Sequence, residues 1–157
     1  MKYQINLQNP NDYQDIPNIF HVQRWVNTVL TSLIDKGDLT IRFVDKKEIQ
    51  SLNKQYRKQD KPTNVLSFPF ELPSEVNDSL SHPILGDIII CHSVVENEAK
   101  AQNKELSAHY AHMIIHGTLH LLGYDHIKQQ DADVMEPLEI AALATLGFNN
   151  PYELIND

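Results

Sequence analysis

The sequence predicts an α+β fold in which a mixed sheet of about four strands packs with helices in a single domain. Segments whose apolar residues alternate, as in strands, are interleaved with segments whose apolar residues recur at helical spacing. The chain has 157 residues and 41% hydrophobic content, which is enough for one core of ordinary size. We therefore expect one domain that covers residues 1–157.

The first part of the chain predicts two strands and the helix between them. Tyr3–Leu7 and Leu39–Phe43 alternate apolar and polar side chains, which is typical of strands with one buried face. Apolar residues at near-helical spacing over Phe20–Leu33 predict a helix, and Gly37 is placed to end it.

A second helix is predicted to follow Asp45, whose side chain can cap it. Glu48, three residues later, gives the start the pattern of a capping box. Ile49, Leu52 and Tyr56 would form the apolar face of this helix, opposite its lysines.

The middle of the chain predicts two more strands. Thr63–Phe70 is rich in β-branched and aromatic residues, and Pro69 implies an edge strand or an irregular end. The stretch Pro73–Pro83 is expected to be a loop. Gly86–Cys91 is a continuous apolar run, as expected of a central strand that is covered on both faces.

Three helices are predicted to complete the fold. Ser93 with Glu96 forms a second capping box, which would open a short helix. Leu106–Leu122 predicts a long helix, and Ala132–Leu146 predicts a final one with Pro137 in or near its first turns.

Composition limits the compartment and the partners. The single cysteine, Cys91, excludes an internal disulfide, and its place after three isoleucines predicts a small buried hydrophobe. The first twenty residues are polar, and no stretch is long and apolar enough to span a bilayer. We expect a cytoplasmic protein with no membrane partner.

The net charge of −8 argues at first against a nucleic-acid partner, but the charge is unevenly distributed. Residues 46–61 carry six basic and two acidic side chains, or +4, whereas the rest has 7 basic and 19 acidic residues, or −12. Such a segment is compatible with RNA binding and equally with a solvated helix face. Its basic residues are Lys46, Lys47, Lys54, Arg57, Lys58 and Lys61.

The most informative segment has three histidines in the pattern H-x-x-x-H-x-x-G-x-x-H. His116 and His120 are four residues apart, so on a helix their imidazoles share one face. Gly123 can end this helix in the left-handed conformation and let the chain return His126 to the same place. Three histidines leave the fourth position of a tetrahedral zinc ion open, as in catalytic sites. We predict one Zn²⁺ per chain at the end of the long helix, although this ligand set also suits Ni, Cu or Fe.

The same spacing occurs in the metzincin proteases, with one difference. Gly117 stands where those enzymes carry the glutamate that acts as general base. Peptide hydrolysis must also protonate a poor amine leaving group, and no residue of the motif is an obvious donor. Gly117 therefore counts against a protease.

Two segments accompany the histidine motif His116–His126, namely Leu52–Arg57 with Pro62–Phe68, and Leu85–Ile90. Together the three segments resemble the YbeY family of bacterial ribosomal-RNA maturation endoribonucleases. Their order and spacing are also similar, and the resemblance extends from about Asp38 to Gly147. Asn64 departs from the pattern, since many members have aspartate there, but the histidine motif is intact.

The resemblance implies a zinc-dependent hydrolase that cleaves single-stranded RNA. It further implies roles in maturing the 3′ end of the small-subunit (16S) ribosomal RNA and in ribosome quality control, with the small subunit as a partner and no DNA. By motif position, the metal ligands fall on His116, His120 and His126, and the functionally important arginine falls on Arg57.

The chemistry of the residues agrees with this assignment. We expect Arg57 and His116 to be catalytic, because a Lewis-acidic metal and a planar guanidinium can neutralise a phosphoryl group. Arg57, Lys54 and Lys58 are the expected substrate-binding residues, since they can follow a phosphate backbone. A surface arginine at a helix end is the alternative interpretation of Arg57.

Two further residues and two further functions stay open. His112 lies on the ligand face of the same helix but is expected to support the site without binding metal, and Asp125 can orient a ligand ring or cap the turn. Met113, Ile114, Leu119 and Leu122 are expected in the core. The alternative functions are a metzincin-like metalloprotease and a non-catalytic ribosome-associated zinc protein, the latter only if a residue such as His112 closes the site.

Overall fold

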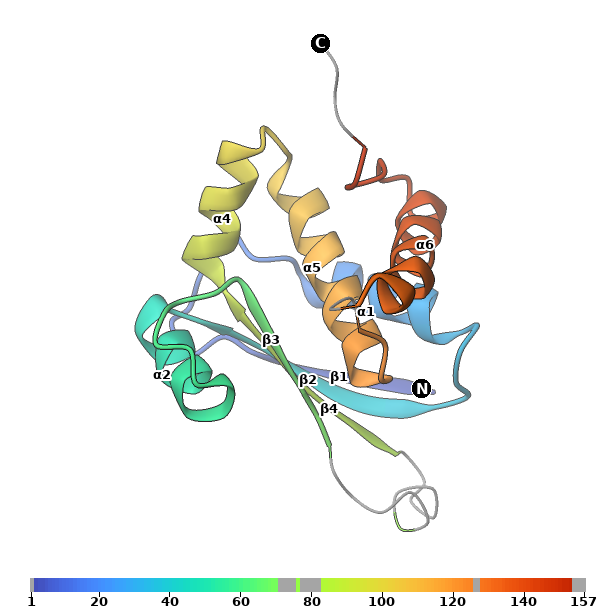
Figure 1. Cartoon of the computed structure of the whole chain (residues 1–157), viewed down its shortest axis with the longest axis horizontal. Coiled ribbons are helices and arrows are strands. Elements are labelled where there is room, and N and C mark those ends of the chain that lie inside the picture. The colour runs from blue at the N-terminus through green and yellow to red at the C-terminus, as the bar shows by residue number, and fades with distance from the viewer. Residues whose placement is uncertain (1, 71–75, 77–82, 126–127, 154–157) are drawn as a thin grey trace.

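The computed structural model describes residues 2–70, 76, 83–125 and 128–153 (Figure 1). Strands and helices alternate along most of the chain, and the α+β class predicted from the sequence is confirmed. The strands are β1 (Tyr3–Gln8), β2 (Gly37–Val44), β3 (Val65–Pro69) and β4 (Ile84–Cys91). The helices are α1 (Ile19–Leu30), α2 (Lys46–Arg57), α4 (His92–Ala101), α5 (Leu106–Leu121) and α6 (Gln129–Thr145). Most of the predicted loop Pro73–Pro83 lies outside the described residues.

The sheet is mixed, with the strand order β1-β2-β4-β3. β1, β2 and β4 are parallel, and β3 pairs antiparallel with β4 at one edge. The sequence predictions of a central β4 and an edge strand ending at Pro69 are therefore confirmed. Proline lacks the N–H that an inner strand would need for pairing, so it suits this edge.

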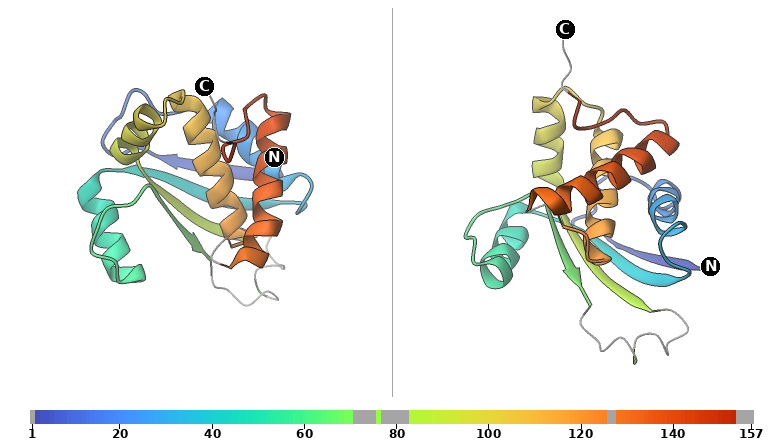
Figure 2. Two further views of the ribbon diagram at one scale, coloured as in Figure 1. Left: turned by 45° about the horizontal axis from the view of Figure 1, so that its top comes forward. Right: turned by 45° about the vertical axis from the view of Figure 1, so that its right-hand side comes forward.

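The two faces of the sheet support different helices. Ile88 and Ile90 of β4 belong to the main core, which they form with α1, α4, α5 and α6. Ile89 and Cys91 point the other way and pack with Ile49 of α2. Figure 2 shows α5 lying across the sheet between α4 and α6, with α2 at the opposite face. The predicted burial of Cys91 follows from this alternation and is confirmed.

Gly37 does not end a helix, contrary to the sequence prediction. α1 ends at Leu30, and a tight turn returns the chain through the N–H groups of Leu33 and Ile34, which both donate to the Leu30 carbonyl. Gly37 begins β2, where its N–H donates to the carbonyl of Lys2 and a Cβ would lie 3.0 Å from the Leu85 side chain. Close strand packing is the reason for this glycine.

The start of α2 is as predicted, and so is most of its apolar face. Ile49 is buried and Leu52 packs against the same cluster, whereas Tyr56 is exposed. Asp45 accepts a hydrogen bond from the Glu48 N–H at 2.8 Å, whereas the Glu48 carboxylate pairs with Arg42. Tyr56 is 58% exposed, and its ring meets that of Phe68 at 64° with the centroids 5.2 Å apart. Asn53 is buried in its place, because its amide donates to the carbonyl of Lys61 and holds the loop that follows the helix.

The capping role predicted for Ser93 is wrong. α4 begins at His92, directly after β4, so Ser93 is already helical and no side chain caps the start. α6 begins at Gln129, three residues earlier than predicted, which places Pro137 in its interior. No described helix has both the length and the apolar character required to cross a membrane.

Candidate active site

α5 contains four histidines, and three of them, His112, His116 and His120, line one cleft with residues of β3. Its other faces are apolar, and Met113, Ile114 and Leu119 are buried as predicted while Leu122 is partly buried. The helix packs on β3, β4, α1, α4 and α6. The histidines thus stand on the most enclosed helix of the fold, which restricts where their rings can point.

Gly123 ends α5 as predicted, with a φ of +98°. Its N–H donates to the His120 carbonyl at 3.0 Å and the Tyr124 N–H donates to the Leu119 carbonyl at 3.2 Å, which is a Schellman motif. The chain then turns back, and Asp125 lines the same cleft as the histidines. His126, the third predicted ligand, lies outside the described residues.

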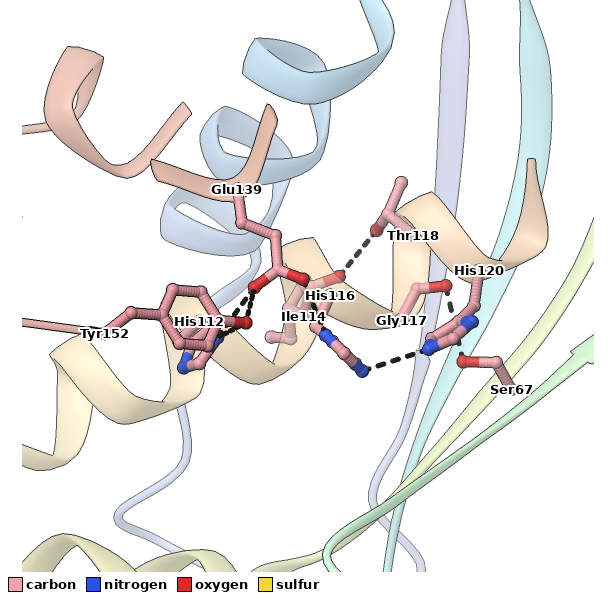
Figure 3. A network of polar contacts seen from close by, with 9 residues as sticks. All are labelled: Ser67, His112, Ile114, His116, Gly117, Thr118, His120, Glu139 and Tyr152. Carbon is pink, nitrogen blue, oxygen red and sulfur yellow. Dashed lines mark hydrogen bonds and ion pairs between the residues drawn. The ribbon is translucent and has the colours of Figure 1, made fainter. Parts of the chain in front are cut away.

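The rings of His116 and His120 face one another (Figure 3). Their Nε2 atoms are 3.0 Å apart, and the ring planes are nearly perpendicular, at 76°. Two nitrogen ligands of a tetrahedral zinc ion are about 3.3 Å apart, given a metal–nitrogen distance of about 2.0 Å. The geometry of this pair therefore fits a shared metal ion with little adjustment.

A buried carboxylate from α6 holds two of the three histidines. Glu139 is fully buried, and its Oε1 accepts a hydrogen bond from His116 Nδ1 while its Oε2 accepts one from His112 Nε2, both at 2.8 Å. The Tyr152 hydroxyl donates to Oε2 at 2.6 Å (Figure 3). Sequence analysis did not single out Glu139 or Tyr152. The only local sign was a charged residue among the apolar positions of α6.

The hydrogen bonds keep Glu139 ionised despite its burial. Burial alone would raise the pKa of this carboxyl from its ordinary value of 4.5, but the bonds from His112 and His116 outweigh that effect and lower the pKa to about 2. Burial, together with the Glu139 charge, raises the pKa of the Tyr152 hydroxyl, so it remains a donor. This network is an anion surrounded by three donors.

His112, His116 and Glu139 also form a group whose potential ligand atoms lie within 4.8 Å of one another. The Glu139 carboxylate already accepts hydrogen bonds of 2.8 Å from both imidazoles, and these bonds account for its contacts with them without a metal ion. The two Nε2 atoms lie 3.0 Å apart, so one cation could be bound by both nitrogens. We therefore interpret Glu139 as a support for the imidazoles, and the space beside His116 and His120 as the candidate metal position.

Arg57 reaches the same cleft from the end of α2. The cleft has a volume of about 820 Å³, and Arg57, Ser67, His116 and His120 are among the residues that line it. The exposed Arg57 side chain donates a hydrogen bond from Nη2 to the carbonyl of Ser67 at 3.0 Å, the one side-chain bond that it makes within the described residues. A guanidinium has five N–H groups, so this bond orients the side chain and leaves donors for a substrate.

The lysines predicted to contact substrate lie differently from Arg57. Lys61 lines the cleft, whereas Lys54 and Lys58 are not among its lining residues. Lys54 Nζ lies 3.8 Å from a carboxylate oxygen of Asp60, and both side chains are exposed. The structure thus brings Arg57, and not its two neighbours, to the histidines.

Asn64, where many YbeY proteins have aspartate, lines the cleft beside Lys61. Its amide donates to both carboxylate oxygens of Glu98, at 3.2 and 3.3 Å, and its side-chain oxygen accepts from the Val65 N–H at 2.7 Å. Glu98 in turn is 2.9 Å from His109 Nε2. An aspartate could accept from Val65 but could not donate to Glu98, so Asn64 suits this particular pair.

Gly117 faces the sheet and not the cleft. A Cβ at this position would lie 3.0 Å from Ile88 Cγ2 and 3.2 Å from Ser67 Oγ. A glutamate here would therefore point between β3 and β4, away from His116 Nε2. The structure gives a second reason, besides the missing carboxylate, why this helix does not provide the general base of a metzincin.

Known proteins match this chain over nearly its full length. The model of the family Endoribonuclease YbeY matches residues 6–147. The protein named Endoribonuclease YbeY from Alcanivorax borkumensis is 51% identical over 149 residues, which cover 94% of this chain and 85% of that protein.

The fold also has a solved relative. The solution structure of TM1509 from Thermotoga maritima superposes with a TM-score of 0.58 and covers 97% of this chain and 99% of that one. Its sequence is 22% identical, so this likeness bears on the fold alone.

Proposed function

This chain belongs to the YbeY family, and from that membership we propose that it is a metal-dependent endoribonuclease that cleaves single-stranded RNA during ribosomal-RNA processing. The finer expectations are action at the 3′ end of 16S ribosomal RNA, in association with the small subunit, and a part in ribosome quality control. The observation that carries the proposal is that Arg57 and the facing pair His116 and His120 line one cleft. A guanidinium and a metal position in one cleft suit a phosphodiester.

The proposed metal ligands are His116, His120 and His126, with one Zn²⁺ per chain. The 3.0 Å separation of the two Nε2 atoms supports this choice. When bound, such an ion would act as a Lewis acid towards a phosphoryl oxygen of the substrate. The chain's own part is to hold the imidazoles in place through Glu139.

Arg57 is proposed to bind the phosphate at the cleavage position. Its tie to the Ser67 carbonyl holds the planar group at the cleft wall, so little conformational freedom is lost when a phosphate binds. Lys61, at the same wall, would contact a neighbouring phosphate, and Lys54 and Lys58 would contact RNA that leaves the cleft along α2.

Arginine-to-lysine substitution tests the phosphate role. Arg57→Lys keeps the charge but loses the fork of donors, so we expect cleavage of a single-stranded RNA to fall about a hundredfold with metal content and fold unchanged. Arg24→Lys is the matched control, because Arg24 is exposed on α1 and does not line the cleft. Single-turnover cleavage by Arg57→Lys within about twofold of the parent protein would contradict the proposal.

Metal analysis tests the ligand set. His120→Ala should lose the metal, whereas His112→Ala should still bind it with reduced affinity, because His112 is proposed to support Glu139 and not to bind the metal itself. The reverse result would favour a site made by His112, His116 and Glu139. A metalloprotease would instead cleave casein in a metal-dependent way and leave RNA intact.

A further inference from the structure

Glu139 is an unusual residue for the interior of a small domain. It lies on α6 against the histidine face of α5, fully buried, and both of its oxygens are engaged. A buried charge of this kind seldom stabilises a fold more than apolar residues of similar volume would. A role in positioning other groups is therefore the better account of its place.

The hydrogen bonds of Glu139 determine the protonation pattern of His116. An ionised carboxylate can only accept, so the proton of a neutral His116 must be on Nδ1, 2.8 Å from Oε1. The lone pair is then on Nε2, which faces His120 Nε2 at 3.0 Å and the cleft. A ring flip would break this bond and turn Nε2 away from the cleft.

Two further donors hold the carboxylate itself. His112 Nε2 binds Oε2 at 2.8 Å, and the Tyr152 hydroxyl binds the same oxygen at 2.6 Å. The Tyr152 ring also meets the His112 ring edge to face, with centroids 5.5 Å apart. Tyr152 follows α6 in the C-terminal segment, where its N–H donates to Asn150 Oδ1 at 2.8 Å. Tyr152 thereby brings the segment that follows α6 to the site.

We propose that Glu139 is a positioning residue that presents His116 Nε2 to the metal, and that Tyr152 and His112 hold Glu139 in the orientation this requires. The inference rests on the proposed metal site. It means that α6 and the segment after it, which lie outside the histidine motif, help to orient a metal ligand. Outer carboxylates that bind metal-ligating imidazoles typically contribute 10-fold to 100-fold in metal affinity.

Zinc affinity measured against a chromophoric chelator tests this role independently of RNA cleavage. Glu139→Gln keeps the side-chain volume but replaces one of the two acceptor oxygens with an NH2 donor, so one histidine loses its acceptor and we expect zinc binding about 10-fold to 100-fold weaker. Tyr152→Phe removes one of the two bonds to Oε2 and should weaken binding severalfold. Asp133→Asn is the control, since Asp133 is an exposed carboxylate on the same helix and pairs with Gln129.

The possible outcomes distinguish the positioning role of Glu139 from the metal site on which it rests. Thermal unfolding in excess chelator shows which variants fold without metal. A folded Glu139→Gln protein with parental zinc affinity would overturn the positioning role. If Glu139→Gln does not fold, Tyr152→Phe decides in its place, and parental affinity there would overturn the role equally. Failure of the parent protein to bind zinc or another divalent ion would count instead against the proposed metal site.

Discussion

Replacing Gly117 with alanine should loosen the contact between α5 and the sheet. The added methyl group would lie 3.0 Å from Ile88 Cγ2 and 3.2 Å from Ser67 Oγ. Ile88 is fully buried, and its branched Cβ allows little rotation. The helix and the strands must therefore separate by a few tenths of an ångström to admit it.

Two opposing effects set the size of the change. Alanine in place of glycine inside a helix stabilises it by about 1 kcal/mol. Overpacking a filled core costs about 1 to 3 kcal/mol. A steric cost of about 2 kcal/mol, reduced by the helix effect of about 1 kcal/mol, gives a net loss of about 1 kcal/mol in the free energy of unfolding of Gly117→Ala.

Urea unfolding followed by circular dichroism measures both effects. Ala141 is exposed inside α6, so Ala141→Gly measures the helix effect where no packing changes. The reasoning is refuted if Gly117→Ala stabilises the protein by as much as Ala141→Gly destabilises it, because the steric cost would then be zero. Gly117→Glu carries the same Cβ and should lose at least as much stability, without gaining hydrolysis of casein.

Two further predictions concern the sheet and the response to acid. Gly86→Ala should lower the free energy of unfolding, measured in urea, by more than about 3 kcal/mol. Gly86 has a φ of +141°, and a Cβ there would lie 2.2 Å from the Phe68 carbonyl oxygen. A smaller loss would show that β3 can move aside. Burial lowers the pKa of His109 below its ordinary value of 6.5, although the Glu98 charge opposes the shift, so the unfolded chain binds a proton there at higher pH than the folded chain does. The contribution of His109 to the free energy of unfolding should therefore be fully present above about pH 6.5 and be lost on acidification. Urea unfolding in the presence of chelator should show a smaller loss of stability with acid for His109→Gln than for the parent protein. Equal losses would contradict the assignment.

The elements that could be predicted from sequence depend on local periodicity and local backbone needs. β4 reads as a continuous apolar run because α2 covers one of its faces and α5 the other. Asp45 and Gly123 were assigned correctly because a cap and a left-handed turn involve only neighbouring backbone groups. Such signals lie within a few residues of the structure that they determine.

The wrong predictions involve partners distant in sequence. Gly37 is a residue type that often ends helices, but here it begins β2, where it pairs with β1 and packs against Leu85. Ser93 and Glu96 have the spacing of a capping box, but β4 runs directly into α4 and leaves no room for a cap. Local patterns of this kind are satisfied by more than one structure, and tertiary packing selects between them.

The support of the histidines was beyond sequence reasoning for the same reason. Glu139 is 23 positions from His116 along the chain, and only the packing of α6 on α5 brings them together. The motif could indicate which residues bind metal, but not what orients them. Tyr152 has still less local signal, because its partner is the buried carboxylate of another element.

Ser67 connects the two sides of the cleft. Its carbonyl oxygen accepts from Arg57 at 3.0 Å, and its Oγ donates to the Gly117 carbonyl at 3.3 Å. β3 is an edge strand, so α5 takes over part of the support that a second neighbouring strand would give it. The absence of a side chain at Gly117 permits the close approach of α5 to Ser67 and Ile88. The position that lacks the general base of a protease thus lies at the contact between α5 and the strand residue that orients Arg57.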